Sequence, residues 1–312
     1  MKLIRKLASF PSHLRGGALT IGNFDGVHLG HAHLISRLKS HAELAAGPAI
    51  VFTFDPHPVR ILNQAQAPAP LTWTDRKAEL LGLLGVDIVI AYPTNLQFLE
   101  LNHTEFFEQV VMREIGARTM VEGPNFFFGK SRTGDVVALH QLCDSHGIEL
   151  DIVEPIKIGN EFISSSRIRK LIASGEVATA GTMLTQAYRI RGLVTHGAAR
   201  GTSLGFPTAN LAGVDTLVPN HGVYAGRAWV ENTSRLAAIH IGPSPTFNDV
   251  PKIEVHLLDF EGSLYGRTLE VEFLNKIRDI LKFDDTRELQ KQIDLDIQQI
   301  RQVAGGNLKQ VI

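Results

Sequence analysis

The sequence is poor in cysteine and aromatic residues, has no long apolar run, and carries almost equal numbers of acidic and basic side chains. Cys143 is the only cysteine, which excludes an intrachain disulfide and a cysteine-rich zinc site. Such low cysteine usage suits a reducing compartment, so we expect a cytoplasmic protein. No apolar run approaches the roughly 20 residues that cross a bilayer, and we therefore expect no membrane-spanning helix.

The charge balance limits the classes of partner. Lysine and arginine total 31, aspartate and glutamate total 32, and the formal net charge is −1. Non-specific binding to nucleic acid needs a positive surface, which this balance does not favour. A local basic cluster can still hold a small phosphate ligand. We therefore expect small-molecule partners, with neither nucleic acid nor membrane among them, and the oligomeric state stays open.

The first half of the chain alternates between strand-like and helical patterns. Because 312 residues exceed one ordinary compact core, we expect two domains. One helix is expected from a cap at Thr104 to Gly116, and residues 1–10 are interpreted as the lead into the first strand, with an organellar transit peptide as the alternative. Short apolar strands separated by helices predict a parallel sheet covered on both faces. The strands are expected at residues 18–24, 49–54, 87–91, 118–121 and 149–153.

The second half is dominated by strand-like runs separated by glycine, proline and asparagine turns, which predicts a small antiparallel barrel or sandwich. A final amphipathic helix is expected after Asp285. The boundary is expected between Ser174 and Tyr188, giving domains of residues 1–183 and 184–312. The strands of this half are expected at residues 188–195, 223–230, 236–242, 253–260 and 269–274.

Residues 22–31, Gly-Asn-Phe-Asp-Gly-Val-His-Leu-Gly-His, lead from the first strand into a helix. Glycines allow a tight turn and a close ligand, and a helix N-terminus attracts anions. His28 and His31 are three residues apart, so they share a face and can donate hydrogen bonds to phosphate oxygens. A metal site or a helix cap with incidental histidines is the alternative. The order of strand, glycines, histidines and helix favours phosphate binding.

Two further segments contain groups that suit phosphate. Residues 163–169, Ile-Ser-Ser-Ser-Arg-Ile-Arg, offer hydroxyls, a helix start and arginines that can pair with phosphate oxygens, although an ordinary serine cap would look alike. Residues 196–205 are expected to form a glycine-rich loop that leads to Phe-Pro-Thr-Ala-Asn at residues 206–210, for which a plain turn is the alternative. Residues 123–131 are not a P-loop, because five residues separate the glycines instead of four.

The first two phosphate segments resemble the HxGH and ISSTxxR signatures of the nucleotidyltransferase superfamily. Residues 22–31, 54–58 and 123–129 are similar to blocks of the FAD synthetase domain of bacterial bifunctional riboflavin kinase/FAD synthetases. The resemblance implies a Rossmann-like α/β domain, and the blocks follow the carboxyl ends of the expected strands, where ligands bind in such sheets. Asn125 and Ser166 stand where this family usually has aspartate and threonine. The implied roles are catalysis by His28, His31 and Arg169, ATP binding by Gly22, Asn23, Phe24, Asp25, Gly30, Ser164, Ser165 and Ser166, and flavin binding by Asp55, His57, Asn125, Phe126 and Phe128.

The segment at residues 205–210 resembles the riboflavin kinase signature GxPTAN, and later matches follow in family order at residues 222–226, 241–247, 254–260 and 264–266. The resemblance implies a riboflavin kinase barrel in which Glu254 takes the proton from the riboflavin 5′-hydroxyl. Strand alternation puts Glu254 and His256 on one face, although a plain solvent-facing glutamate is the alternative. Thr202 and Ser244 stand where the family usually has arginine. The other implied roles are phosphate binding by Gly201, Gly205, Thr208 and Asn210, Mg²⁺ binding by Thr208 and Asn210, and flavin binding by Tyr224.

The resemblance therefore implies two reactions that use ATP and Mg²⁺: phosphorylation of riboflavin to FMN, and adenylylation of FMN to FAD with release of pyrophosphate. Three alternatives remain. The barrel could be a degraded module that binds flavin without kinase activity, as Thr202 and Ser244 suggest. The whole chain could be a non-catalytic flavin or nucleotide sensor. Nucleic-acid modification is the most distant possibility.

Overall fold

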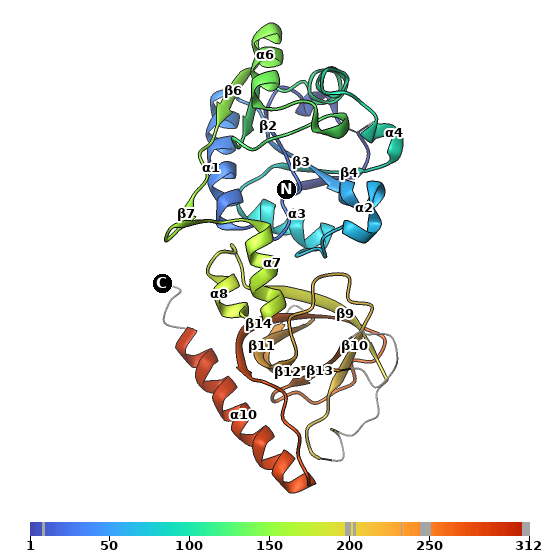
Figure 1. Ribbon diagram of the computed structural model, residues 1–312, viewed down its shortest axis with the longest axis vertical. Helices are drawn as coiled ribbons and strands as arrows, with labels where there is room; N and C mark the ends of the chain where they lie inside the picture. The colour runs from blue at the N-terminus through green and yellow to red at the C-terminus, as the bar shows by residue number, and fades with distance from the viewer. Residues whose placement is uncertain (8–9, 197–200, 202–203, 232, 244–250, 308–312) are drawn as a thin grey trace. The chain divides into compact units, whose positions relative to one another are not determined.

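The computed structural model describes residues 1–7, 10–196, 201, 204–231, 233–243 and 251–307 (Figure 1). Thr202 and Ser244 lie outside these residues. The chain divides into two compact units, the first formed by Met1–Pro68 and Trp73–Ser164, the second by Ala69–Thr72 and Ser165–Ile312. The helices just after Ser164, which the sequence pattern places before the domain boundary, group with the second unit in this division. The boundary at residues 183 and 184 stays a prediction.

The first unit contains a six-stranded parallel sheet in the order β1-β4-β3-β2-β5-β6 (Figure 1). All five strands expected from the apolar runs are present. The lead-in segment itself forms a further edge strand, β1, which pairs with β4. The strands are β1 (Lys2–Ile4), β2 (Ala18–Ile21), β3 (Ala49–Asp55), β4 (Ile88–Pro93), β5 (Thr119–Glu122) and β6 (Glu149–Ile152).

Helices cover both faces of this sheet, as expected for parallel strands with apolar side chains on both sides. Leu19 of β2 and its neighbours pack against one set of helices, and the adjacent Ala18 faces the core that contains Ile35 and Leu81. The helix expected to be capped by Thr104 is capped instead by Asn102, whose side chain accepts from the N–H of Glu105. The helices are α1 (Leu29–Leu44), α2 (Pro58–Leu62), α3 (Thr74–Leu83), α4 (Leu96–Leu99), α5 (His103–Phe106), the π-helix η4 (Phe107–Ile115) and α6 (Val136–His146).

The second unit contains a closed antiparallel barrel in the strand order β10-β13-β12-β11-β14-β9. The expected strands are present, and β10 is an addition, because the segment around Asn210 reads as a turn in the sequence. The strands are β9 (Arg189–Thr195), β10 (Ala209–Ala212), β11 (Gly222–Val230), β12 (Thr233–Gly242), β13 (Lys252–Leu257) and β14 (Thr268–Arg278). Two helices precede the barrel, α7 (Ser165–Ser174) and α8 (Val177–Gly181).

The expected final helix is α10 (Thr286–Asn307), and Asp285 caps it by accepting from the N–H of Glu288 at 2.8 Å. Ile297 and Ile300 of α10 pack against a small core on the barrel. Arg278 of β14 holds Asp296 of the helix through two close contacts, Nε to Oδ1 at 2.9 Å and Nη2 to Oδ2 at 2.8 Å. Within the described chain, no helix combines the length and apolar character that crossing a membrane needs.

Candidate active sites

The connection from β2 to α1 is a sharp turn with several residues in the left-handed region. Gly26 has φ +85°, and Phe24 and Val27 have φ +46° and +39° without being glycine. Such values cost free energy for residues with a Cβ, so the surroundings must hold them. The side chains of Phe24 and Val27 are buried in the core under the turn. Core packing thus stabilises the turn and brings His28 to the start of α1.

His28 and His31 bind each other's backbone at this helix start. Nδ1 of His28 accepts from the N–H of His31, and Nδ1 of His31 accepts from the N–H of His28, both at 3.3 Å. The two rings stack with centroids 3.6 Å apart and planes 14° from parallel. A Cβ on Gly30 would lie 3.1 Å from the His28 ring, closer than is comfortable. The glycine between the histidines therefore makes room for the first imidazole.

The environment keeps both imidazoles neutral. Burial lowers the pKa of His28 to about 4. Burial also holds the pKa of His31 well below its usual value, and the charges of His28 and Lys77 add to that effect. Because each Nδ1 accepts a backbone hydrogen bond, the ring proton of the neutral form belongs on Nε2. The turn thus offers two N–H donors at a helix N-terminus, a combination that suits anionic oxygens.

A cavity of about 460 Å³ opens beside this turn within the first unit. Gly22 and Asn23 line it together with His57, Asn125, Phe126 and Phe128, so three of the motifs meet in one cavity. The rings of Phe126 and Phe128 stack with centroids 5.3 Å apart. Phe54, Phe98 and Phe106 add further aromatic walls. An apolar, aromatic cavity with a few polar groups suits a fused-ring ligand.

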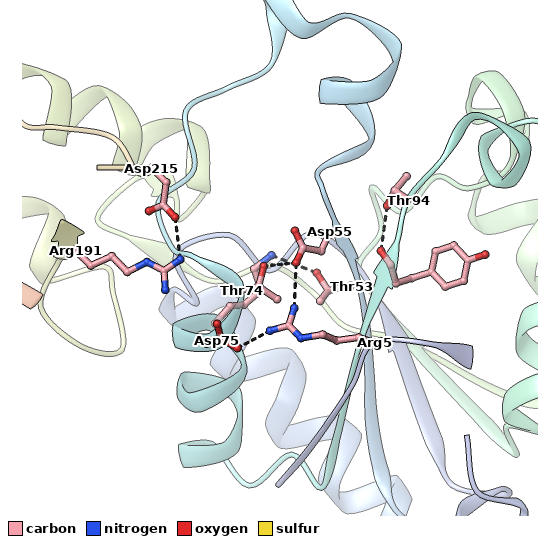
Figure 2. A network of polar contacts seen from close by, with 10 residues as sticks. Arg5, Thr53, Asp55, Thr74, Asp75, Thr94, Arg191 and Asp215 are labelled. Atoms are coloured by element: carbon pink, nitrogen blue, oxygen red, sulfur yellow. Dashed lines mark hydrogen bonds and ion pairs between the residues drawn. The ribbon is translucent and has the colours of Figure 1, made fainter. Parts of the chain in front are cut away.

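Asp55 is not among the residues that line this cavity. Its Oδ2 accepts from the hydroxyl of Thr74 at 2.7 Å and from Arg5 at 3.4 Å, and Arg5 also contacts Asp75 at 2.5 Å (Figure 2). These contacts tie the chain after β1 and the end of β3 to the start of α3. The position gives Asp55 a structural task, and its assignment as a flavin contact stays a prediction.

The serine and arginine segment spans the division between the two units. Ser164 ends the first unit, while Ser165, Ser166 and Arg169 lie in α7 of the second. Arg169 Nε donates to the carbonyl of Ala69 at 2.9 Å, a contact inside the second unit. The roles of these four residues toward ATP stay predictions.

A polar row crosses the barrel of the second unit. Asn210 of β10 lies opposite Glu254 of β13, and Glu254 lies opposite His240 of β12. Directly opposite residues of antiparallel strands share a face, and the alternate residues Ile253 and Val255 are buried, as the strand pattern predicts. The strand register therefore puts Asn210, the candidate metal ligand, beside Glu254, the candidate base.

Glu254 is held as an ionised carboxylate. Nδ1 of His240 is 3.3 Å from its Oε2, and Lys252 Nζ donates to its Oε1 at 2.7 Å. His240 first and then Lys252 lower the pKa of Glu254 to about 2, against the opposing effect of burial. A carboxylate with such a pKa is ready to accept a proton at neutral pH but is a weak base.

The glycine-rich loop brings Thr208 back over its own start. A Cβ on Gly201 would be 2.4 Å from the carbonyl of Phe206 and 3.3 Å from the Thr208 hydroxyl, so only glycine fits there. Gly205 has φ +88°, which also favours glycine. No cluster of three or more histidine, cysteine or acidic ligands occurs among the residues that the structure describes. The hydroxyl and amide oxygens of Thr208 and Asn210 fit Mg²⁺, which keeps waters and ligand phosphates in its shell.

Tyr224 is fully buried in the barrel core. Its hydroxyl donates to the carbonyl of Asn220 at 2.5 Å, and its ring meets Phe273 edge to face. Burial raises its pKa to about 12. These contacts give Tyr224 a place in the core, and its assignment as a flavin contact stays a prediction.

The comparisons with known proteins match this two-part arrangement. A family model described as FAD synthetase matches residues 10–167, and one described as riboflavin kinase matches residues 184–304. A bifunctional riboflavin kinase/FMN adenylyltransferase from Pseudomonas fluorescens is 33% identical over 98% of both chains, and one from Haemophilus influenzae is 34% identical over 96% of this chain and 97% of its own. The chain belongs to the bifunctional riboflavin kinase/FMN adenylyltransferase family.

A solved structure shares the fold of this family member along nearly its whole length. It is described as a macrolide-efflux protein from Streptococcus pneumoniae, is 30% identical, and has a TM-score of 0.85 over 96% of this chain and 98% of its own. The similarity covers both the parallel sheet and the barrel.

Sequence reasoning missed several polar groups that the structure puts at these sites. Lys77 and Glu122 are buried in the first unit, and His240 and Lys252 flank Glu254 in the second. Lys77 could have been found from the sequence, because it shares a helix face with Leu80, Leu81 and Leu84. A charged residue on such an apolar face is unusual. No sequence pattern marks Glu122 as buried, because it only ends an apolar run.

Gly30→Ala separates helix stability from site geometry. Alanine is the better helix former by roughly 1 kcal/mol, which is about what disturbing the His28 cap would cost, so the free energy of unfolding should change by less than about 1 kcal/mol. The new Cβ would displace the His28 ring, and we expect the rate of any phosphate chemistry at this turn to fall about 10-fold or more. Urea unfolding measures the stability of the variant, and turnover of the same preparation measures its rate. Full activity would contradict the steric role of Gly30.

The low pKa of His28 predicts a pH dependence of stability. The unfolded chain binds a proton at this histidine near pH 6.5, and the folded chain does so only near pH 4. The unfolded state thus holds more protons between these values, so stability rises with pH in that window and is lost as pH falls. Asparagine is also a good helix cap, so His28→Asn should fold and lose this part of the slope. Urea unfolding of both proteins across the window measures it, and identical slopes would contradict the assignment.

Proposed function

We propose that the chain makes FAD from riboflavin in two ATP-dependent steps. Residues 184–312 phosphorylate riboflavin to FMN, and residues 1–183 adenylylate FMN to FAD with release of pyrophosphate. The observation that carries the proposal is that each family match contains a polar site suited to its own step: the neutral histidine pair lies in residues 10–167, and the ionised Glu254 lies in residues 184–304.

In the adenylylation step, a phosphate oxygen of FMN attacks the α-phosphorus of ATP. The bond from that phosphorus to the bridging oxygen breaks, and pyrophosphate leaves. No base is needed, since the FMN phosphate is already anionic. The Nε2–H groups of His28 and His31 donate to phosphate oxygens and stabilise the charge that builds on the leaving group. In the first unit, we assign ATP binding to Gly22–Asp25, Gly30 and Ser164. The roles of Ser165, Ser166 and Arg169 toward ATP are those that the sequence resemblance implies.

The flavin ring of FMN occupies the aromatic cavity of the first unit. Phe126 and Phe128 offer stacked ring faces, and His57 and Asn125 offer polar atoms at the wall. A cavity of about 460 Å³ is of the size that small-molecule sites have. Gly22 and Asn23 line the same cavity, so a flavin bound there would lie next to the phosphate turn, as transfer to a bound FMN requires.

In the kinase step, the 5′-hydroxyl of riboflavin attacks the γ-phosphorus of ATP, and ADP leaves. Glu254 takes the hydroxyl proton. Since its pKa is only about 2, the proton moves late, as the new bond to phosphorus forms. Thr208 and Asn210 would hold Mg²⁺, which would supply positive charge to the ATP phosphates. Gly201 and Gly205 let the backbone of their loop approach the phosphates.

We place the protein in the cytoplasm, with riboflavin, FMN and ATP as its partners. The single cysteine, buried Cys143, suits a reducing compartment. The near-neutral charge gives no reason to add nucleic acid.

Chromatography of the flavins made by the purified protein with ATP and Mg²⁺ tests both steps. Riboflavin should yield FMN and then FAD, and supplied FMN should yield FAD. FAD from FMN without any FMN from riboflavin would support the degraded-kinase alternative. Flavin binding with no product from either substrate would support a sensor.

Variants should separate the two steps. His28→Asn removes one Nε2–H donor, and we expect FAD formation from FMN to fall about 100-fold while FMN formation from riboflavin stays within twofold. Glu254→Ala should reverse the pattern, because it removes the proton acceptor of the kinase step. Initial rates with each flavin measure both effects. Equal loss of both activities in either variant would contradict two independent sites.

A further inference from the structure

Lys77 is a buried lysine for which the mechanism above has no task. It lies in α3, and only 7% of its surface is exposed. A buried ammonium is costly unless hydrogen bonds and opposite charges compensate it. Its surroundings therefore indicate what the charge is for.

Hydrogen bonds link Lys77 to the phosphate turn through one side chain. Lys77 Nζ donates to the Thr53 hydroxyl at 3.4 Å, and that hydroxyl donates to the carbonyl of Asn23 at 3.1 Å. Thr53 is fully buried in β3, the neighbour of β2 in the sheet. The chain of contacts thus runs from α3 through β3 to the residue that opens the turn.

Lys77 interacts electrostatically with titratable groups of three segments: the turn, β3 and α1. Asp25 of the turn and Asp55 at the end of β3 both raise the pKa of Lys77, against burial, which lowers it more. His31 of α1 is also near enough for the lysine charge to lower the pKa of that ring. Asp55 is itself fixed by Thr74 and Arg5 (Figure 2). Lys77 is thus the positive centre of a cluster made of Asp25, Asp55 and the neutral His31.

We propose that Lys77 is a positioning residue for adenylyl transfer, whose ammonium holds the Asn23–Asp25 turn in place and supplies positive charge beneath the phosphate turn. It acts through Thr53 and the turn rather than by touching ATP. Both histidines are neutral, and Asp25 and Asp55 lie near the lysine, so the ammonium of Lys77 offsets carboxylate charge that would otherwise repel a polyphosphate at the turn. The inference rests on the proposed adenylylation at this turn.

Three variants test the role in the full-length protein. Lys77→Met removes the charge and keeps most of the volume, and Lys77→Arg keeps the charge. Arg76→Met is the matched control, because Arg76 is also a buried base of α3 but pairs with Glu79 of its own helix at 2.8 Å. Each variant is assayed for FAD formation from FMN, for FMN formation from riboflavin, and for urea unfolding.

We expect Lys77→Met to lower kcat for FAD formation 10-fold to 100-fold, with FMN formation unchanged within twofold. Lys77→Arg should restore most of the rate, and Arg76→Met should leave kcat within threefold of the wild-type value. The pH profile adds a readout that a structural role would not move. Since burial lowers the pKa of Lys77, wild-type FAD formation should decline at alkaline pH as the ammonium loses its proton. Arginine keeps its charge there, so Lys77→Arg should lack that decline.

Several results would overturn the role. An unchanged kcat in Lys77→Met would do so, as would equal losses in Lys77→Met and Arg76→Met, or the same alkaline decline in Lys77→Arg and wild type. The arginine variant keeps the test decisive if the methionine variant does not fold. A wild-type protein that makes no FAD from FMN would instead refute the proposed function and the role of Lys77 with it.

Discussion

The first site depends on the reciprocal hydrogen bonds between His28 and His31. Each imidazole accepts the backbone N–H of the other residue at 3.3 Å, so the rings cap α1 and fix their own tautomers at once. The stacked arrangement requires Gly30, because a side chain there would displace the first ring. It also requires the left-handed turn at Phe24, Gly26 and Val27, which presents His28 at the cap. Removing any of these features would leave two histidines without a defined donor direction.

The two sites differ in charge: the first has a neutral histidine pair and the second an ionised glutamate. This difference matches the different nucleophiles of the two proposed steps. In the proposed adenylylation the phosphate of FMN is an anion that needs no base, and the histidine pair would offer uncharged donors to the phosphates of ATP. In the proposed kinase step the 5′-hydroxyl of riboflavin must lose a proton, and Glu254, the proposed acceptor, is kept ionised by His240 and Lys252. The histidine pair could not serve the second task well, because each Nδ1 already accepts a backbone hydrogen bond, each Nε2 carries the ring proton, and burial lowers the pKa of both rings. Separate sites in one chain are therefore chemically reasonable.

The sequence predicted the regular parts of the fold well because buried parallel strands and a helix with one apolar face leave strong patterns. It failed where an element is short or where a contact is long-range. Strand β10 contains only Ala209–Ala212 and follows a Gly-Phe-Pro-Thr run that reads as a turn. Asn102 displaced Thr104 as a cap because the chain enters the helix two residues earlier than its apolar pattern indicates. The contacts of Asp55 with Arg5 and Thr74 could not be predicted, because these partners come from segments far away in the sequence.

Several departures from local preference in the first unit lie at the carboxyl edge of its sheet. Phe24 and Val27 adopt left-handed backbone there, and Lys77 is buried behind them. Glu122 lies at the end of β5, where burial raises its pKa well above the usual value. Its carboxyl oxygen accepts a hydrogen bond from the N–H of Ile21 at 2.7 Å, whereas the backbone pairing of β2 with β5 ends at Leu19 and Met120. The side chain thus replaces a backbone partner and lets the two strands separate next to Gly22.

Such features each oppose folding when taken alone, since strained backbone and buried charge are costly. The central strands of the unit follow simple rules, with alternating residues facing two apolar cores. A chain under selection for stability alone would have little reason to keep a buried lysine and a buried glutamate on opposite sides of one turn. Their concentration around residues 22–31 suits a binding site for charged ligands, because electrostatic interactions with a phosphate are stronger where water is excluded. The costs therefore point to the same turn as the motif does, and they do so from physics that is independent of sequence similarity.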